Sequence, residues 1–279
     1  AAPLPAAPPA AAPSPAEPPA ATPPPRASAA SPRRRSSARS PASALKGYTR
    51  RRASAKLKPR DPSLMSFFEE TLPKWAAVAE SDAFASGQQV PCKLFLDATV
   101  QLIKIFDSIY GMGMVKDDID GNRAKIEANL LKLPADAQPA ATLQSMCRAE
   151  LAAAKGDAAA ASVEGSTCLA ILWLKRALLL VEGMLEALVA DAKAELADCV
   201  NKGYEKGLKM HHNMIMKGVF NTAYHAIPYR ADFTKALGDP AKVEADMPAV
   251  WKTFAAIMTP LDAFLKETKI EPPPSDSWW

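Results

Sequence analysis

The sequence predicts an all-α fold, and three observations support this prediction. From about Pro62 onward, apolar residues recur with the spacing of helices almost throughout. No stretch alternates apolar and polar side chains as a half-buried strand would, and no internal repeat is visible. Residues 61–279 are rich in Leu, Ala, Met and Phe and are numerous enough for one sizeable core. We therefore expect one helical domain over residues 61–270.

Prolines and glycines set the expected helix boundaries, because both residues end regular helical patterns. Pro73 should interrupt the first helix and Pro260 the last. Residues 81–91 are expected to form a loop, and the Ala-rich residues 156–165 a partly helical link. In order along the chain, we expect helices over residues 66–79, 93–110, 116–132, 142–155, 168–198, 201–226, 231–237 and 247–268.

The expected helix over residues 168–198 is the longest and the most apolar. Its first half is apolar on more than one face, which is typical of a helix at the centre of a bundle. Lys175, Arg176, Glu182 and Glu186 interrupt its apolar run, so we do not expect it to cross a bilayer.

The composition of residues 1–60 differs from that of the rest of the chain. They hold 14 of the 26 prolines, 12 Lys or Arg and one acid, a net charge of +11, so the remaining residues carry −7 of the overall +4. With so few bulky apolar side chains this extension should be disordered alone. It is either a solvated basic leader or, being rich in Arg and Ser and poor in acids, a targeting segment for a plastid or mitochondrion. Its Arg clusters suit anionic lipid or nucleic acid equally, but because no nucleic-acid-binding fold follows, we rank a nucleic-acid partner low.

The cysteines and histidines show no pattern of a metal site. Four cysteines (Cys92, Cys147, Cys168 and Cys199) are widely separated, with no CxxC or Cys/His ligand spacing, so we expect free, buried thiols. No catalytic triad order or Gly-rich phosphate loop is present either. We therefore expect no enzyme activity, no metal and no cofactor.

Asp118, Asn122 and Lys125 have the spacing of one helical face, i, i+4 and i+7. Together they offer a carboxylate, an amide and an ammonium, which are acceptors and donors suited to a polyhydroxylated headgroup. Such a face is more often plain solvated surface, and a lone Trp173 or His212 more often packs in a core. A binding role is favoured because the three features occur together, in the segments DIDGN, WLKRAL and PYRADFTKAL and their flanks.

These segments, in this order, resemble the glycolipid transfer protein family from about Phe95 to Leu237. The resemblance implies a two-layer helical bundle that encloses an apolar lipid pocket, and a protein that carries a sphingolipid between membranes. It implies that Asp118 and His212 bind the ceramide amide, and that Asp118, Asn122, Lys125 and Trp173 bind the headgroup. His211 matches a position that is not a ligand in the family, and His225 is expected to be a surface or packing residue.

Trp173 favours an uncharged sugar headgroup. In relatives that bind ceramide-1-phosphate, this position and the one a turn later resemble a basic phosphate clamp, whereas this chain has Trp173 and Ala177. Candidates for the walls of the hydrocarbon pocket are apolar residues of several expected helices: Phe95, Ile103, Phe106, Leu169, Leu172, Met214, Ile215 and Phe220.

The chain departs from the family at its membrane-facing and terminal segments. Glycolipid-type members have a docking Trp just after the histidine, where this chain continues with Asn213 and Met214. Arg230 and the neighbouring Tyr229 are candidates for an interfacial patch. Residues 271–279 form a Pro-rich tail ending in Trp-Trp, a candidate docking hook, with no counterpart of the family's C-terminal Tyr contact.

Two functions from different classes fit these observations. The first is a carrier of a glycosphingolipid-like molecule, cytoplasmic and peripheral to membranes. The alternative is an accessory subunit of a large membrane-associated organellar complex, with protein partners bound through residues 1–60 and 271–279.

Overall fold

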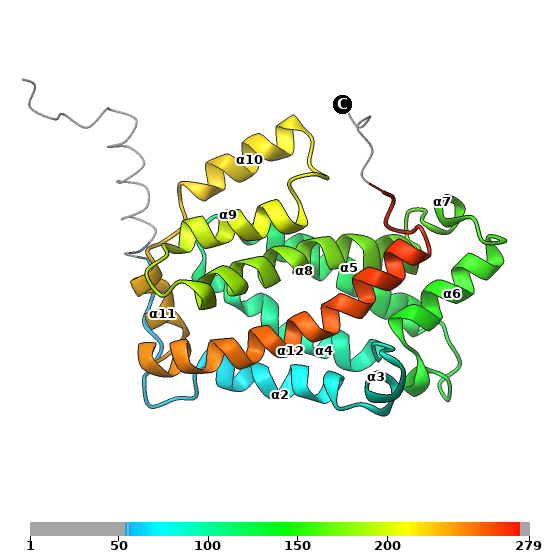
Figure 1. Ribbon diagram of the computed structural model, residues 1–279, viewed down its shortest axis with the longest axis horizontal. Coiled ribbons are helices and arrows are strands. Elements are labelled where there is room, and N and C mark those ends of the chain that lie inside the picture. Colours follow the sequence, from blue (N-terminus) through cyan, green and yellow to red (C-terminus); the bar gives the residue numbers. More distant parts are fainter. Residues whose placement is uncertain (1–53, 55, 274–279) are drawn as a thin grey trace, which may run out of the picture. The chain divides into compact units, whose positions relative to one another are not determined.

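The computed structural model describes residue 54 and residues 56–273. Within these residues the regular structure is helical (Figure 1). One isolated β-bridge joins Pro91 and Thr142. The α-helices are α2 (Phe67–Ala79), α3 (Asp82–Gly87), α4 (Cys92–Leu102), α5 (Gly113–Leu130), α6 (Leu143–Ala153), α7 (Ala158–Ala161), α8 (Thr167–Ala190), α9 (Leu196–Gly207), α10 (Met214–Tyr224), α11 (Arg230–Leu237) and α12 (Pro240–Glu267), and the 3-10 helices are η1 (Ile103–Ser108) and η2 (Gln138–Ala140).

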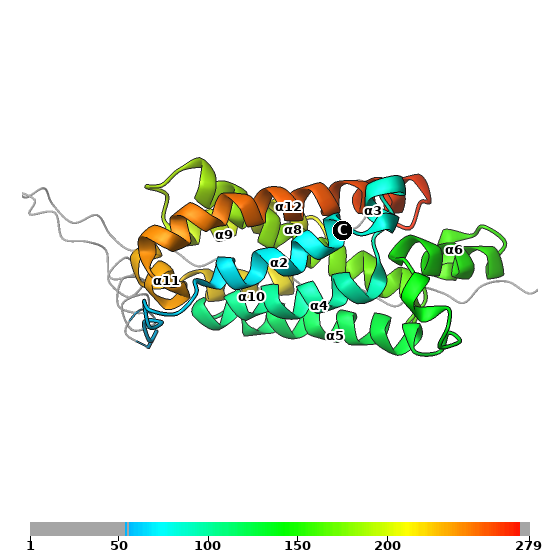
Figure 2. The same cartoon turned by 90° about the horizontal axis from the view of Figure 1, so that it is seen from below.

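The long helices form two layers of three. Helices α2, α4 and α5 pack side by side in one layer, and α12, α8 and α9 in the other. The layers meet where α2 contacts α12 and where α5 contacts α8 (Figure 2). The all-α, two-layer prediction is thus confirmed, and α8 is the central, mostly buried helix that the sequence predicts.

The space between the layers is filled by apolar side chains. Trp75 of α2 is fully buried and meets Phe95 of α4 and Phe254 of α12 edge to face, with ring centroids 5.5 and 4.6 Å apart. Five of the expected wall residues are buried (Phe95, Ile103, Phe106, Leu172 and Phe220), of which Phe220 belongs to α10 and stacks on Tyr204 of α9. Met214 and Ile215 were expected to line this interior, but they lie on the surface and are 82% and 77% exposed.

Helices α8 and α9 approach each other more closely than side chains would allow. A Cβ atom added to Gly203 would lie 2.0 Å from the Leu180 carbonyl oxygen, and one added to Gly207 would lie 2.3 Å from that of Arg176. The absence of a side chain at these positions permits direct backbone contact. Helix α9 is therefore held in a fixed place against α8.

Several expected helix boundaries are wrong, and local caps explain most of the differences. The expected helix over 201–226 is two helices, because Asn213 caps α10 by accepting a hydrogen bond from the Met216 N–H at 3.0 Å. Likewise, the expected helix over 168–198 ends at Ala190, and α9 begins at Leu196.

Prolines misled the prediction at the last helix. Asp239 caps α12, with Pro240 in its first turn, so the helix begins seven residues earlier than expected. It then continues through Pro260, and α2 continues through Pro73, because buried apolar residues on both sides of each proline hold the helix in place. Residues 82–87, expected in a loop, form α3 behind the capping Ser81.

Arg230 is a structural residue, contrary to the expected interfacial patch. It is buried, and its guanidinium donates to the carbonyl oxygens of Leu188, Asp191 and Ala194 at 3.0, 2.7 and 3.3 Å. These carbonyls lie at and just beyond the C-terminal end of α8, where backbone acceptors need partners. Arg230 thereby joins α11 to the end of the central helix.

All four cysteines are free and buried, as expected. None of the described helices combines the length and the apolar character needed to cross a membrane. The expectations for residues 1–53 and for Trp278 and Trp279 lie outside the described residues.

Candidate lipid headgroup site

A cavity of about 520 Å³ opens between α5, the start of α8 and the connection from α9 to α10. Its lining includes both polar and apolar residues: Met114, Val115, Asp118, Asn122, Lys125, Glu164, Gly165, Ser166, Leu169, Ala170, Trp173, Leu208, His211, His212, Asn213 and Met216. The five site residues expected from the sequence are all among them. They come from three segments that are far apart along the chain.

The start of α8 is fixed by two sets of hydrogen bonds. Ser166 caps the helix and accepts from the Leu169 N–H at 3.1 Å. The carboxylate of Glu150 accepts from the Thr167 and Cys168 N–H groups at 2.7 and 2.8 Å. A carboxylate at this end is favoured by the helix dipole. The first turns of α8, which carry Trp173, therefore enter the cavity wall in a set orientation.

The polar face of α5 is arranged before any ligand binds. The Asn122 amide donates to the Asp118 carbonyl at 2.9 Å and to its carboxylate at 3.3 Å, and Asn122 is buried. Partial burial raises the pKa of Asp118 above its ordinary value, while the hydrogen bond from Asn122 and the charge of Lys125 oppose that shift. Lys125 forms an ion pair with Glu164 at 2.9 Å across the cavity edge. Glu164 was not singled out in the sequence, because nothing local links it to Lys125.

His212 is held by an aromatic neighbour. Its Nδ1 atom lies 3.3 Å from the Tyr204 hydroxyl, and the Tyr204 ring stacks on Phe220 with centroids 3.6 Å apart. Burial, together with the charge of Lys217, lowers the pKa of His212, so its imidazole is neutral at pH 7. Tyr204 is a second residue that sequence reasoning missed.

Trp173 contacts two nitrogen-bearing side chains. The guanidinium carbon of Arg176 is 4.7 Å from the centre of the indole, and the His211 ring meets the indole edge to face at 6.4 Å. His211 also lines the cavity, although it was not expected to bind a ligand. Burial and the neighbouring Arg176 lower its pKa to about 4.

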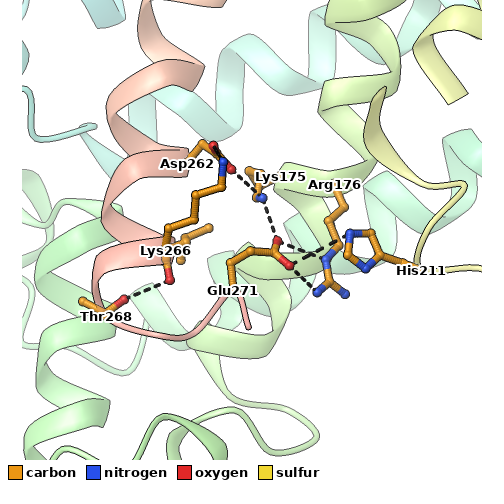
Figure 3. A network of polar contacts seen from close by, with 8 residues as sticks. Lys175, Arg176, His211, Asp262, Lys266, Thr268 and Glu271 are labelled. Atoms are coloured by element: carbon orange, nitrogen blue, oxygen red, sulfur yellow. Dashed lines mark hydrogen bonds and ion pairs between the residues drawn. The ribbon is translucent and has the colours of Figure 1, made fainter. Parts of the chain in front are cut away.

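His211 belongs to a network of charged side chains that also includes Lys175, Arg176, Asp262 and Glu271 (Figure 3). Lys175 donates to Asp262 and to Glu271, both at 2.7 Å. Arg176 donates to the two carboxylate oxygens of Glu271 at 2.6 and 3.2 Å. Burial acts to raise the pKa of Glu271, but the hydrogen bonds from Arg176 and Lys175 outweigh it and lower that pKa.

The network also locates the start of the expected C-terminal tail. Glu271 is only 7% exposed, and its carboxylate lies 3.9 Å from His211. The chain past α12 thus returns to the headgroup cavity with a carboxylate, at a place where the sequence suggested no contact.

The donor set of the cavity suits an uncharged polar ligand. It combines two carboxylates, the ammonium of Lys125, two amides, one hydroxyl, two neutral imidazoles and one indole, and the charge of Lys125 is paired with that of Glu164. In the described part of the chain no cluster of three or more His, Cys, Asp or Glu could hold a metal ion.

Comparisons with known proteins agree with this fold. The family model described as "Glycolipid transfer protein (GLTP)" matches residues 90–239. The glycolipid transfer protein of Aureobasidium melanogenum is 33% identical over 194 residues, which cover 68% of this chain and 90% of that protein.

Solved structures with different lipid specificities are similar to this chain. The fungal glycolipid transfer protein HET-C2 is 28% identical with a TM-score of 0.61, and covers 73% of this chain and 99% of its own. The apo form of mouse ceramide-1-phosphate transfer protein is 17% identical with a TM-score of 0.65, and covers 76% of this chain and 100% of its own. Since the two scores are so close, the fold alone does not select between a sugar and a phosphate headgroup.

Proposed function

The chain belongs to the glycolipid transfer protein family, and from this premise we propose that it binds a sphingolipid with an uncharged sugar headgroup and carries it between membranes. One observation supports the proposal above all others. Asp118, Asn122, Lys125, Trp173 and His212, from three distant segments, line a single cavity. The proposed chemistry is binding and release, with no bond made or broken.

The amide of the lipid explains the pairing of Asp118 with His212. An amide presents one N–H donor and one carbonyl acceptor, and burying either without a partner costs roughly 2–7 kcal/mol. The Asp118 carboxylate accepts from the N–H. If the Tyr204 hydroxyl donates to Nδ1 of His212, the ring proton is on Nε2, which then donates to the carbonyl. Tyr204 therefore sets the tautomer that amide binding requires.

The sugar would bind to the other members of the set. Asn122 offers its amide oxygen as an acceptor and Lys125 its ammonium as a donor to the hydroxyls. The Trp173 indole offers a flat apolar surface for the C–H face of the ring. A phosphate would find no free cation at Trp173, because Arg176 behind the indole is already paired with Glu271.

Transfer also requires contact with a membrane, and we propose that the exposed aliphatic residues beside the cavity provide it. Met210, Met214 and Ile215 lie on the α9–α10 connection and the first turn of α10, next to the cavity residues Asn213 and Met216. This patch replaces the missing aromatic anchor with flexible aliphatic side chains, which can enter the apolar region of a bilayer at little cost.

The headgroup role is tested by vesicle-to-vesicle transfer of a fluorescent galactosylceramide. Asp118→Asn removes the charged acceptor and should slow transfer by about 10- to 100-fold, since a hydrogen bond to a charged group contributes roughly 1.5–3 kcal/mol. Asp117→Asn is the matched control, because Asp117 is exposed and lies outside the cavity lining. Equal transfer rates in the two variants would refute the role of Asp118, and a wild-type protein that moves no glycolipid would refute the function.

Docking is tested separately from binding. Ile215→Glu should slow transfer between vesicles at least fivefold, yet leave the affinity for a soluble, short-chain glycolipid unchanged. Leu131→Glu is the control, since Leu131 is also an exposed aliphatic residue, at 65% against 77% for Ile215, and follows α5. If both substitutions slow transfer equally, the patch has no special part in docking.

A further inference from the structure

The two cations behind the cavity wall are not used by the proposed binding of an uncharged lipid. Building on the proposed function, we infer that Glu271 determines which headgroup charge the cavity accepts. By occupying Lys175 and Arg176, its carboxylate cancels their charge next to the headgroup and so disfavours a phosphate or sulfate. Glu271 is thus a specificity residue supplied by the chain beyond α12.

The cation pair lies one side-chain layer from the cavity. Arg176 is 4.7 Å from the indole of Trp173, and Glu271 is 3.9 Å from the imidazole of His211. Trp173 and His211 both line the cavity. A charge at this depth is weakly screened, so its sign affects any charged group in the cavity.

The geometry around Glu271 is that of an occupied anion site. The Arg176 guanidinium donates to both carboxylate oxygens, and Lys175, at 3% exposure, donates to one of them. A planar fork and an ammonium that converge on one oxyanion would suit a phosphate or sulfate equally well. Removing the carboxylate would leave two buried cations facing one space.

The position of Glu271 follows from the backbone. Helix α12 ends in a turn with Lys269 in the left-handed region at φ 60°, and the Glu271 N–H donates to the Leu265 carbonyl at 2.8 Å. Between them, Ile270 is buried in the core. The turn therefore fixes the carboxylate over the cation pair.

Asp262 provides a matched comparison. It also accepts from Lys175, but it makes a second ion pair with Lys266 at 2.6 Å and is partly exposed. No contact joins it to Trp173 or His211 among those found in the described residues. Its charge is therefore more screened and farther from the cavity wall.

The first test compares a matched pair of lipids, galactosylceramide and its 3-sulfated form, in neutral phosphatidylcholine vesicles. Glu271→Gln keeps polar atoms for hydrogen bonding and removes the charge. The ratio of sulfated to neutral lipid bound should rise about tenfold, the effect of one unit charge in a weakly screened site. Asp262→Asn should change this ratio less than threefold. The double variant Lys175→Met with Glu271→Gln restores the net charge of the network. In that variant the ratio should return to the wild-type value.

The second test needs no lipid. Sodium sulfate, compared with sodium chloride at equal ionic strength, should raise the melting temperature of Glu271→Ala more than that of wild type or Asp262→Asn. Those two proteins should show only the general stabilisation that sulfate gives to folded proteins. This measurement also covers a variant that is unstable without an anion, because sulfate should then restore its folding.

Each outcome has a distinct meaning. An unchanged lipid ratio in a folded Glu271→Gln protein, or no specific effect of sulfate on Glu271→Ala, would overturn the inference and leave the proposed function intact. A wild-type protein that binds neither lipid would overturn the proposed function and, with it, this role of Glu271.

Discussion

The close contact between α8 and α9 makes Gly203→Ala the most quantitative test of the structure. The new Cβ atom would lie 2.0 Å from the Leu180 carbonyl oxygen and 2.9 Å from the Met184 nitrogen. Both are backbone atoms of the central helix and cannot rotate away. Since carbon and oxygen need at least about 3 Å, α9 must move outward by about 1 Å.

Two effects of opposite sign decide the magnitude. Alanine favours the helical state over glycine by about 1 kcal/mol. Against this, a shift of about 1 Å loosens the packing of the whole α9 face, including Val200 and Tyr204, and overpacking of this kind costs about 1–3 kcal/mol or more. Because the clash is between backbones, we expect a cost at the upper end, about 3 kcal/mol. After the helix gain is subtracted, the net loss is about 2 kcal/mol, or about 4–8 °C in melting temperature for a domain of this size.

Thermal and urea unfolding, followed by far-UV circular dichroism, measure this loss. Gly121→Ala is the control, because a Cβ at this position in α5 meets nothing within 4 Å and should only add helix stability, up to about 1 kcal/mol. Gly207→Ala, whose Cβ would lie 2.3 Å from the Arg176 oxygen, should resemble Gly203→Ala. A Gly203→Ala protein as stable as wild type, alongside a normally behaving control, would refute the close contact.

Three further predictions concern other parts of the fold. The pKa of His211 falls from 6.5 to about 4 on folding, so between these pH values the unfolded chain binds a proton that the folded chain does not. The contribution of His211 to the free energy of unfolding is therefore complete above pH 6.5 and falls by at most about 3 kcal/mol toward pH 4. In urea titrations, His211→Asn should reduce this pH dependence. Arg230→Met leaves three backbone carbonyls without their donor and should cost about 3 kcal/mol by urea unfolding, a loss below 1 kcal/mol being contrary to its capping role. Tyr204→Phe should slow glycolipid transfer about 5- to 10-fold with little change in melting temperature, and a normal rate would disprove its control of the His212 tautomer.

Local patterns were sufficient to predict the polar face of the site. The spacing of Asp118, Asn122 and Lys125 depends only on helical geometry, and α5 forms as a helix through all three. Trp173 and His212 could be added because their surrounding segments resemble one family. The expected all-α layers needed no more than periodicity and the length of the apolar segments.

Contacts between distant residues could not be predicted in this way. Glu271 meets Arg176 across 95 residues, and Lys125 meets Glu164 across 39. Nothing in either local sequence encodes the partner, because each pair forms only after the two layers have packed. The break before α10 is different: the capping Asn213 was present in the sequence, but the apolar residues on both sides suggested one continuous helix.

Because every cysteine is buried, the native protein should react slowly with thiol reagents. Burial raises the pKa of Cys92 to about 12 and also raises that of Cys199, so neither offers a thiolate at neutral pH. Cys147 and Cys168 are enclosed as well. A single cysteine placed at the exposed Ile215 would thus be the one readily labelled thiol, and a polarity-sensitive dye attached there would report membrane contact without any need to remove the native cysteines.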